Sequence, residues 1–193
     1  MADKISNSNY DIIKWKSDNP LHPQQMNEQS VDWIFLVDSL NFSFWPDTGR
    51  EFTIKGEVGY WALCAAINSA LRESIPVCDP NYYAKLTYKQ AEHIFRTDQT
   101  GVVIPMLQER IEILNQNGQI LLEVRILSEF IIKKKNSFTK FIIINIKKKF
   151  DGTFVNCIKE ANSNCITLLK LIYNHFPSFR DECVYKGHQG TFR

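Results

Sequence analysis

The sequence predicts a mainly α-helical protein of one domain, with a minor β-strand or hairpin. Residues 31–45 are apolar on nearly every face of a helix, so a helix formed there has to be buried. Residues 58–72 carry apolar side chains at spacings of three and four, with alanines that allow another helix to approach closely. At 193 residues, the chain is long enough to bury a core of its own.

The first predicted helix covers 31–45, with Ser30 as its N-cap. Asp38 lies inside it, on the same face as Val31. A carboxylate buried there needs a partner or a raised pKa, because an ionised and unpaired carboxylate is very costly to bury. We expect Asp38 to cap a neighbouring helix or to pair with an arginine. The alternative is that this helix forms one wall of a pocket with aromatic sides and a few polar groups.

Capping and helix-breaking residues predict the remaining elements. These are a short strand over 51–55, a helix over 58–72, a connector over 81–86, a helix from a capping box at Thr87 and Gln90 to about Arg96, a helix from Pro105 to Gly118, and a helix over about 154–175 that Pro177 ends.

The composition is that of an ordinary soluble globular protein, with 44% hydrophobic and 23% charged residues. A formal net charge of only +2 gives no reason to expect a nucleic-acid or membrane surface. The five cysteines form no Cys-x-x-Cys pair, which favours free thiols in a reducing compartment over disulfides or a zinc site. No apolar leader and no run long enough to span a membrane are present. We therefore expect a cytoplasmic or nuclear protein.

Residues 124–149 differ from the rest of the chain. Of these 26 residues, 19 are Ile, Lys, Asn or Phe, whose codons begin with two A/T bases. The first two, Val-Arg, can be encoded by GTAAGA, which looks like a splice donor. Our hypothesis is an intron-derived or disordered insertion between Glu123 and Phe150. The alternative is a genuine basic β-hairpin, or a lysine-rich patch for nucleic acid.

Four blocks of sequence resemble the queuosine salvage proteins. These are Val31–Trp45, Gly59–Leu71, Glu109–Asn115 and Phe176–Asp181, and the resemblance runs from about Trp15 to Phe192 with 124–149 left out. It implies a fold similar to that of helical DNA glycosylases, and hydrolysis of queuosine 5′-phosphate at the bond between ribose and base. The queuine that is released can be reinserted into tRNA. The family implies no metal or organic cofactor, and we expect a monomer that binds a small nucleotide without contacting tRNA.

Cleavage of a base from ribose passes through an oxocarbenium-like state, so the site needs a carboxylate near the sugar and hydrogen bonds at the base. A flat heterocycle also calls for aromatic walls and a few polar groups at its edge. The resemblance assigns His22 to contact the base; on its own this histidine would be a surface-loop residue. Asp38 and Asn41 match parts of the family motif, and with Trp61 they complete the predicted substrate-binding set. For these three residues, core support or packing is the alternative. No metal ligand is predicted.

The family's catalytic aspartate lies in an Ala-Asp-Tyr-Arg type motif beyond the block that matches Phe176–Asp181, and this sequence reaches Arg193 without it. We therefore expect a partial domain over 1–193, whose catalytic residue is not in the chain. We also expect little or no hydrolase activity, and apolar faces left exposed on the helix over 154–175.

Two further expectations concern basic residues. Arg110, beside two glutamates, is predicted to be an exposed helical ion-pair former. Lys133–Lys135 and Lys147–Lys149 support the alternative function, a non-catalytic helical module that binds RNA or a protein partner. These lysines all lie within 124–149, where seven lysines and one arginine face one glutamate, so the rest of the chain would carry a formal charge of about −5.

Overall fold

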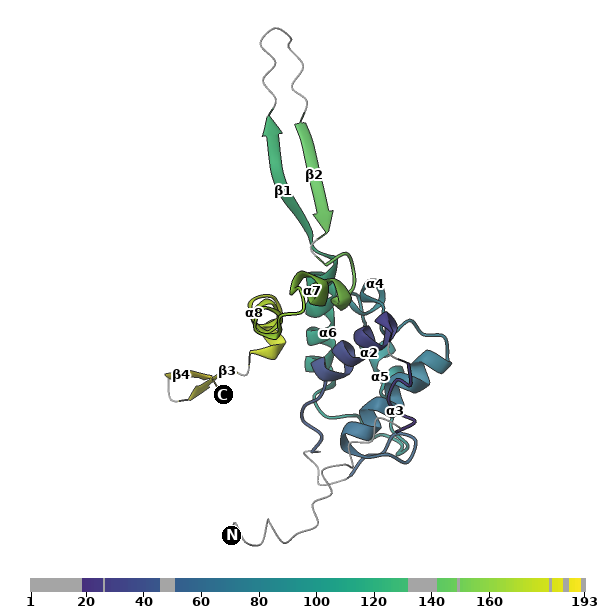
Figure 1. Ribbon diagram of the computed structural model, residues 1–193. Helices are drawn as coiled ribbons and strands as arrows, with labels where there is room; N and C mark the ends of the chain where they lie inside the picture. The colour runs from purple at the N-terminus through teal and green to yellow at the C-terminus, as the bar shows by residue number, and fades with distance from the viewer. Residues whose placement is uncertain are drawn as a thin grey trace, which may run out of the picture.

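The computed structural model describes residues 19–25, 27–45, 51–131, 142–148, 150–180, 182–185 and 188–191. In chain order, the elements are α2 (Glu28–Ser39), α3 (Gly59–Arg72), α4 (Pro80–Tyr83), α5 (Tyr88–Ile94), α6 (Leu107–Leu122), β1 (Val124–Ile131), β2 (Ile142–Lys148), α7 (Phe154–Glu160), α8 (Cys165–His175), the 3-10 helix η2 (Pro177–Phe179), β3 (Glu182–Tyr185) and β4 (His188–Thr191). Helices α2 to α7 gather into one body, from which the β1–β2 hairpin projects (Figure 1). The prediction of a mainly helical chain is confirmed, and the strands of the described residues form two antiparallel pairs, β1–β2 and β3–β4.

Helix α2 begins earlier and ends earlier than predicted. Asn27, not Ser30, is its N-cap, because the Asn27 side chain accepts a hydrogen bond of 2.9 Å from the Ser30 N–H. The helix ends at Ser39, and residues 41–44 follow in an irregular path. Trp33 is among the buried residues of α2, but the expectation that Asp38 is buried is wrong: this residue is exposed.

Helix α3 has almost the predicted bounds, and its alanines are buried in the core as expected. It packs beside α2, where the Trp33 indole N–H donates to the Asn68 Oδ1 at 3.0 Å. The predicted strand over 51–55 is wrong. The described residues there form only an isolated bridge between Ile54 and Glu57, around a tight turn.

The predicted connector over 81–86 is wrong, because Asp79 caps a short helix, α4, that opens with Pro80. This helix packs against α6, and the contact explains Gly118. A Cβ atom on Gly118 would lie 2.7 Å from the Cβ of Ala84, so only glycine fits between the two segments. The prediction that Gly118 ends α6 is therefore wrong, because Gly118 lies buried within the helix.

The capping box at Thr87 and Gln90 is confirmed, although α5 ends slightly before Arg96. The predicted helix over 154–175 is two helices. Asn162 and Ser163 have φ angles of 49° and 59°, in the left-handed region, and their turn separates α7 from α8. Helix α8 ends at His175, ahead of Pro177, as predicted.

The N-terminus of α7 is capped from α2. Asp32 accepts hydrogen bonds from the Thr153 hydroxyl at 2.9 Å and from the Phe154 N–H at 3.0 Å. Asp32 is thus the carboxylate of α2 that caps a neighbouring helix, a role that the sequence had suggested for Asp38.

Strands β1 and β2 pair antiparallel, from Val124 opposite Lys148 to Ile131 opposite Ile142. The base of this hairpin is closed on the helical body, where the Gly152 N–H donates to the Leu121 carbonyl at 3.1 Å. Lys133–Lys135 lie outside the described residues.

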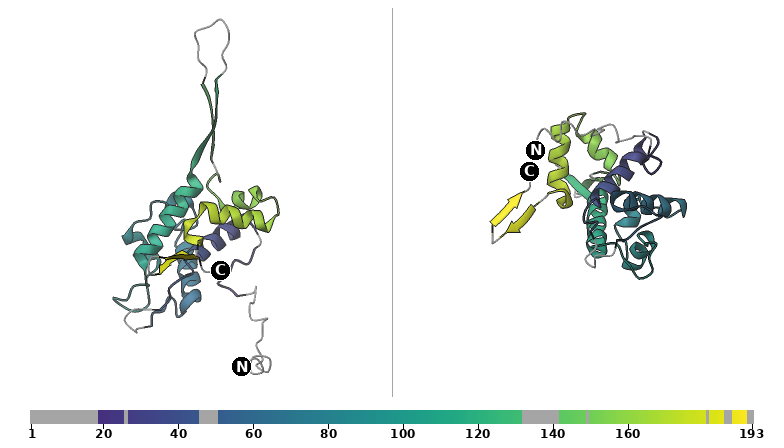
Figure 2. Two further views of the ribbon diagram at one scale, coloured as in Figure 1. Left: turned by 90° about the vertical axis from the view of Figure 1, so that its left-hand side faces the viewer. Right: turned by 90° about the horizontal axis from the view of Figure 1, so that it is seen from below.

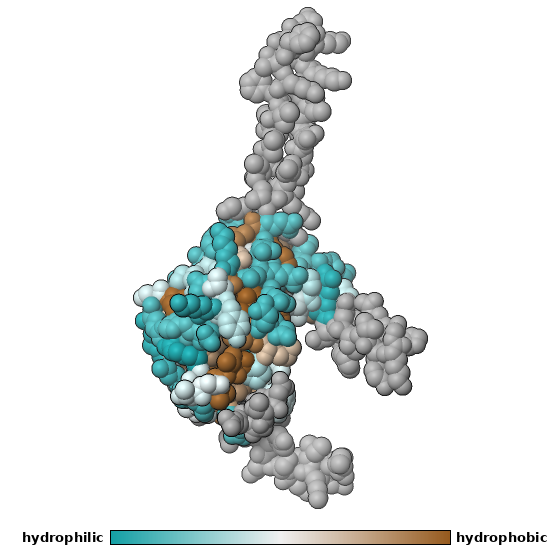
Figure 3. Space-filling model, turned by 180° about the vertical axis from the view of Figure 1, so that it is seen from behind, coloured by the Kyte–Doolittle hydropathy of each residue, from teal (hydrophilic) through white to brown (hydrophobic). Residues whose placement is uncertain are grey.

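Helix α8 stands at the edge of the body and has no buried residue. Its Ile166, Leu169 and Tyr173 side chains are exposed, so the expected exposed apolar face is present on this helix. The β3–β4 ribbon extends away from α8 (Figure 2). Apolar residues also form a band on the rear face of the body (Figure 3). Among the described helices, none has the length and apolar character of a membrane span.

Candidate functional site

His22 lies among three aromatic rings at the surface of α2 and α3. Its Nε2 is 3.0 Å from the Tyr60 hydroxyl oxygen. The His22 ring centroid is 5.0 Å from that of Trp61, 5.7 Å from that of Tyr60 and 6.0 Å from that of Trp33. The imidazole is half-buried in this cluster. Two of the predicted site residues, His22 and Trp61, are therefore brought into contact.

The segment that carries His22 is fixed by Asn68. The Asn68 Nδ2 donates to the Leu21 carbonyl at 2.8 Å, while its Oδ1 accepts from the Trp33 indole. One amide side chain thus links the loop before α2 to both helices. The loop also closes on itself, because the Leu21 N–H donates to the Asn19 Oδ1 at 2.9 Å. These contacts hold the imidazole against the aromatic rings.

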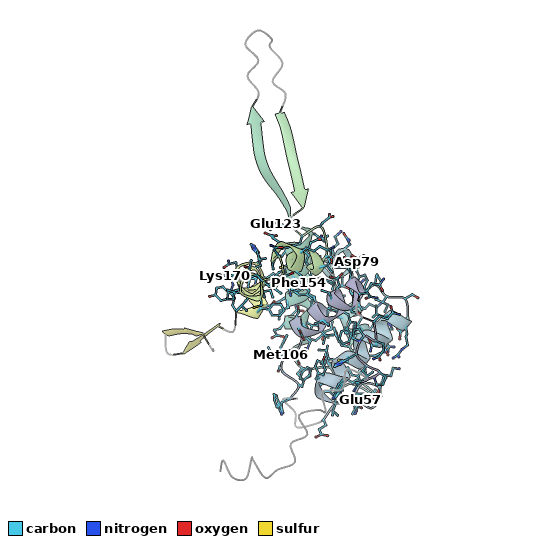
Figure 4. All side chains as sticks on the ribbon, in the orientation of Figure 1. Glu57, Asp79, Met106, Glu123, Phe154 and Lys170 are labelled. Atoms are coloured by element: carbon cyan, nitrogen blue, oxygen red, sulfur yellow. The ribbon has the colours of Figure 1, made fainter. Side chains whose placement is uncertain are left out.

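A cleft of about 880 Å³ opens on one side of His22. Trp33 and Asn68 line it together with His22, and Arg72 and Asp79 supply charged groups at its wall. Asp79, a residue of the cleft wall, is labelled in Figure 4 on the upper part of the helical body, and Glu57, which precedes α3, is labelled at the lower end. The volume is within the usual range for small-molecule sites. Trp61, Asp38 and Asn41 do not line this cleft.

Asp38 and Asn41 lie at the C-terminal end of α2, and both are exposed. Although Asp38 is exposed as a residue, partial desolvation by its surroundings raises the pKa of its carboxyl group. Its negative charge in turn contributes to the raised pKa values of Tyr60 and Cys64, for which burial is the main cause. Burial raises the pKa of Cys64 to about 11. The charge of Asp38 therefore affects Tyr60, the partner of His22.

Asn41 is held by its backbone, whose N–H donates to the Asp38 carbonyl at 3.3 Å. Among the described residues, no hydrogen bond joins its side chain to the aromatic cluster. The structure thus joins His22 with Tyr60 and Trp61. Asp38 acts on Tyr60 through its charge, and Asn41 is not brought into this group by any hydrogen bond among the described residues.

The prediction that Arg110 is an exposed helical ion-pair former is wrong. This residue is 0% exposed and donates to backbone carbonyl groups rather than to carboxylates. The pattern around it contained the sign of burial: Arg110 is three residues after Leu107 and four before Leu114, so it shares the apolar face of α6. Asn68, which holds the loop of His22, was also missed, because no local pattern predicts a contact between a helix and a distant loop.

Within the described part of the chain, no group of three or more His, Cys, Asp or Glu side chains is arranged to hold a metal ion. Cys64, Cys78 and Cys165 are free thiols in the described part of the chain.

Comparison with known proteins identifies the family. The profile of the queuosine salvage protein family matches residues 21–192. The queuosine 5′-phosphate N-glycosylase/hydrolase of Mus musculus is 38% identical over 191 residues, which cover 94% of this chain and 47% of the relative. The proteins of the same name from Nematostella vectensis and Schizosaccharomyces pombe are 37% and 32% identical, covering 97% and 98% of this chain and 48% and 51% of those relatives. This chain therefore spans about half the length of the curated relatives it matches, and it belongs to the queuosine salvage protein family.

Proposed function

We propose that this protein acts in the hydrolysis of queuosine 5′-phosphate, in which the bond between ribose and base is broken and queuine is freed for salvage into tRNA. The names of its relatives support this activity. The observation in the structure that supports it most directly is the setting of His22, hydrogen-bonded to Tyr60 and surrounded by aromatic rings. A flat heterocyclic base needs such aromatic faces together with a polar group at its edge.

The roles proposed within the site follow from this setting. His22 contacts the base and supplies the polar group at its edge, while Tyr60 orients the imidazole through Nε2. Trp61 packs beside the imidazole and supplies an aromatic wall. Asp38 and Asn41 are proposed as further substrate contacts at the end of α2. We assign the catalytic carboxylate to none of the described residues.

Hydrolysis by this route transfers the electrons of the breaking glycosidic bond to the base nitrogen. Water adds to the sugar carbon, and the proton that the water loses is balanced by the one that the released base gains. Hydrogen bonds at the base edge favour departure, because they stabilise the charge that develops on the leaving base. Such a mechanism needs no metal or organic cofactor, in agreement with the expectation from the family. The proposal extends to a fold similar to that of helical DNA glycosylases, which the packing of α2, α3, α5 and α6 around a core supports.

We further propose that the protein is a monomer of the cytoplasm or nucleus, which binds its nucleotide directly and does not contact tRNA. A non-catalytic RNA- or protein-binding module is not favoured, since the relatives are named as hydrolases. Filter binding of tRNA to the purified chain checks this point. Salt-sensitive binding that persists without 124–149 would favour the binding module.

The central experiment is titration of the purified chain with queuosine 5′-phosphate by calorimetry, with free queuine quantified in the same samples by mass spectrometry. We expect His22→Ala to weaken nucleotide binding about tenfold or more, the equivalent of about 1.4 kcal/mol. His93→Ala, at an exposed histidine of α5, is the matched control and should bind as the unmodified chain does. Equal affinity of the His22→Ala and His93→Ala variants would refute the role of His22.

A further inference from the structure

Helix α8 carries apolar side chains on the side that faces away from the core. Ile166 is 62% exposed and Leu169 is 67% exposed, and Tyr173 follows four residues later on the same face of the helix, also exposed. The other side of α8 packs against the core through three partly buried residues, Leu168, Leu171 and Ile172. The helix is therefore apolar on two sides, and only the second of them packs against the core.

Both ends of α8 are satisfied within the protein. Asn164 caps the N-terminus, because its Oδ1 accepts a hydrogen bond of 3.0 Å from the Thr167 N–H. At the other end, Arg180 donates to the Tyr173 carbonyl at 2.7 Å and to the Asn174 carbonyl at 3.1 Å. These bonds pair carbonyl groups that the end of a helix leaves without partners. The form of α8 thus does not depend on another polypeptide.

The segment that follows α8 anchors this helix to the body. Phe176 is fully buried, and its ring centroid is 5.1 Å from that of Phe35 in α2. In η2, the Ser178 hydroxyl donates to the Asn117 Oδ1 at 3.2 Å. The Asn117 Nδ2 in turn donates to the Ser39 hydroxyl at 3.0 Å. Because α2 and α6 both hold the end of α8, its exposed apolar face is presented by a braced helix.

The chemistry of this face suits contact with another polypeptide. A helix that is apolar on nearly every side is normally buried, and apolar side chains gathered on a surface mark sites of interaction. Lys170, beside Leu169, is exposed and forms no ion pair within the described residues, so the face also offers a cation to a partner. In Figures 1 and 2, α8 lies at the edge of the body, where a second polypeptide can reach it.

The comparisons with relatives indicate which polypeptide covers this face. Helix α8 lies inside the range that matches the family, residues 21–192. The aligned region covers 47% of the Mus musculus relative and 48% of the Nematostella vectensis relative, so about half of each relative has no counterpart in this chain. Parts of one polypeptide that fold against each other need a contact surface, and an ordered apolar face supplies one.

We propose that the α8 face, formed by Ile166, Leu169, Lys170 and Tyr173, is the docking surface for the part of the family's polypeptide that has no counterpart in these 193 residues. The docked part presents apolar side chains to Ile166 and Leu169 and an acidic side chain to Lys170. This inference rests on the proposed function, because the docked part completes a hydrolase whose catalytic carboxylate is assigned to none of the described residues.

The test co-expresses this chain with the unmatched part of the Mus musculus relative as a separate polypeptide. We expect a complex with one copy of each, its mass measured by light scattering during size-exclusion chromatography, and slower hydrogen exchange of the α8 amides within it. Leu169→Lys should weaken association about tenfold or more, because it places a charge in an apolar contact. Val103→Lys, at an exposed apolar residue between α5 and α6, is the matched control and should associate as the unmodified chain does.

Both variants alter exposed side chains, so their melting temperatures should match that of the unmodified chain. Ile166→Lys repeats the test if Leu169→Lys does not fold. The proposal is overturned if the co-expressed part is insoluble or elutes separately, or if the Leu169→Lys and Val103→Lys variants associate equally well. A chain that forms a dimer on its own, and loses it in Leu169→Lys, would assign the face to a second copy and would also overturn the proposal.

Release of queuine from queuosine 5′-phosphate separates this inference from the function on which it rests. We expect the complex to release queuine, and Leu169→Lys to lose this activity at concentrations where it no longer associates. A complex that depends on Leu169 but releases no queuine leaves the docking surface in place and refutes the proposed function. A complex that releases queuine and associates normally with Leu169→Lys supports the function and overturns the docking surface.

Discussion

The Nε2 of His22 and the hydroxyl oxygen of Tyr60 lie 3.0 Å apart, and this contact joins the loop before α2 to the first turn of α3. Burial raises the pKa of Tyr60, so the phenol keeps its proton at neutral pH. The hydroxyl can donate to a neutral imidazole or accept from a protonated one. Tyr60 can therefore orient His22 in either protonation state.

Tyr60→Phe should remove this orientation and keep the ring. We expect the free energy of unfolding to fall by about 0.5–1.5 kcal/mol, the usual contribution of one hydrogen bond. Nucleotide affinity should fall severalfold, because the imidazole loses its fixed direction. Urea unfolding and calorimetric titration measure the two effects. Tyr88→Phe, at an exposed tyrosine of α5, is the control, and a variant at Tyr60 that binds no worse than this control would show that the hydroxyl does not position His22.

Asp38 should give the stability of the protein a recognisable pH dependence. Because desolvation raises its pKa in the folded state, the folded chain holds this proton more tightly than the unfolded chain. The stabilisation is fully present below the unfolded pKa, about 3.9, and is lost as the pH rises through the folded pKa. The unfolding free energy of the unmodified chain minus that of Asp38→Asn should therefore become smaller from acid toward neutral pH. Urea unfolding at a series of pH values measures it, and a difference that increases with pH would contradict this environment for Asp38.

The parts of the fold that sequence predicted are those that depend on neighbouring residues. The Thr87–Gln90 capping box, the bounds of α3 and the stop before Pro177 are local events, decided within a turn or two of helix. The end of α2 was missed because a distant residue, Arg110, binds the carbonyl groups that follow the helix. Long-range contacts of this kind leave little trace in periodicity.

The candidate site shows the same division between local features, which the sequence predicts, and long-range contacts, which it does not. The resemblance indicated His22, and the structure places Trp61 against it. Asn68 and Tyr60, which fix the imidazole, come from a helix distant in sequence, and no local pattern predicts their contacts with the loop of His22. Asp38 was expected to be buried because the helix around it is apolar on most faces, but the fold leaves its own face of α2 uncovered.

Gly118→Ala should destabilise the protein although alanine favours helices. The gain in helix propensity is at most about 1 kcal/mol. The added Cβ would lie 2.7 Å from the Cβ and 2.8 Å from the Cα of Ala84, so the backbone of one segment has to move. We expect a net loss of about 1–2 kcal/mol, in the range found for overpacked cores. Thermal unfolding measures it, with Gln119→Ala on the exposed face of α6 as the control. A Gly118→Ala variant more stable than this control would mean that α4 and α6 are less closely packed than the structure shows.

The last prediction concerns residues 124–149, which we propose are an insertion in a single domain over 1–193. The chain enters and leaves this segment at one place, because the Leu121 carbonyl accepts from the Gly152 N–H at 3.1 Å. Strands β1 and β2 pair with each other and project from the helical body (Figure 1). On the far side of the segment, Phe150 is fully buried in the core. The contacts that close the domain therefore lie outside the insertion.

Joining Glu123 directly to Phe150 should leave the helical body folded. Closing a long loop costs entropy that grows with the logarithm of its length, so the deletion should leave the free energy of unfolding unchanged or raise it by up to about 2 kcal/mol. Urea unfolding followed by far-UV circular dichroism measures this, with a Gly/Ser segment of equal length in place of 124–149 as the control. If both variants lose cooperative unfolding, the segment is an integral part of the domain. Its origin is tested separately, because an intron is absent from spliced message, and message that still encodes these residues would contradict that origin.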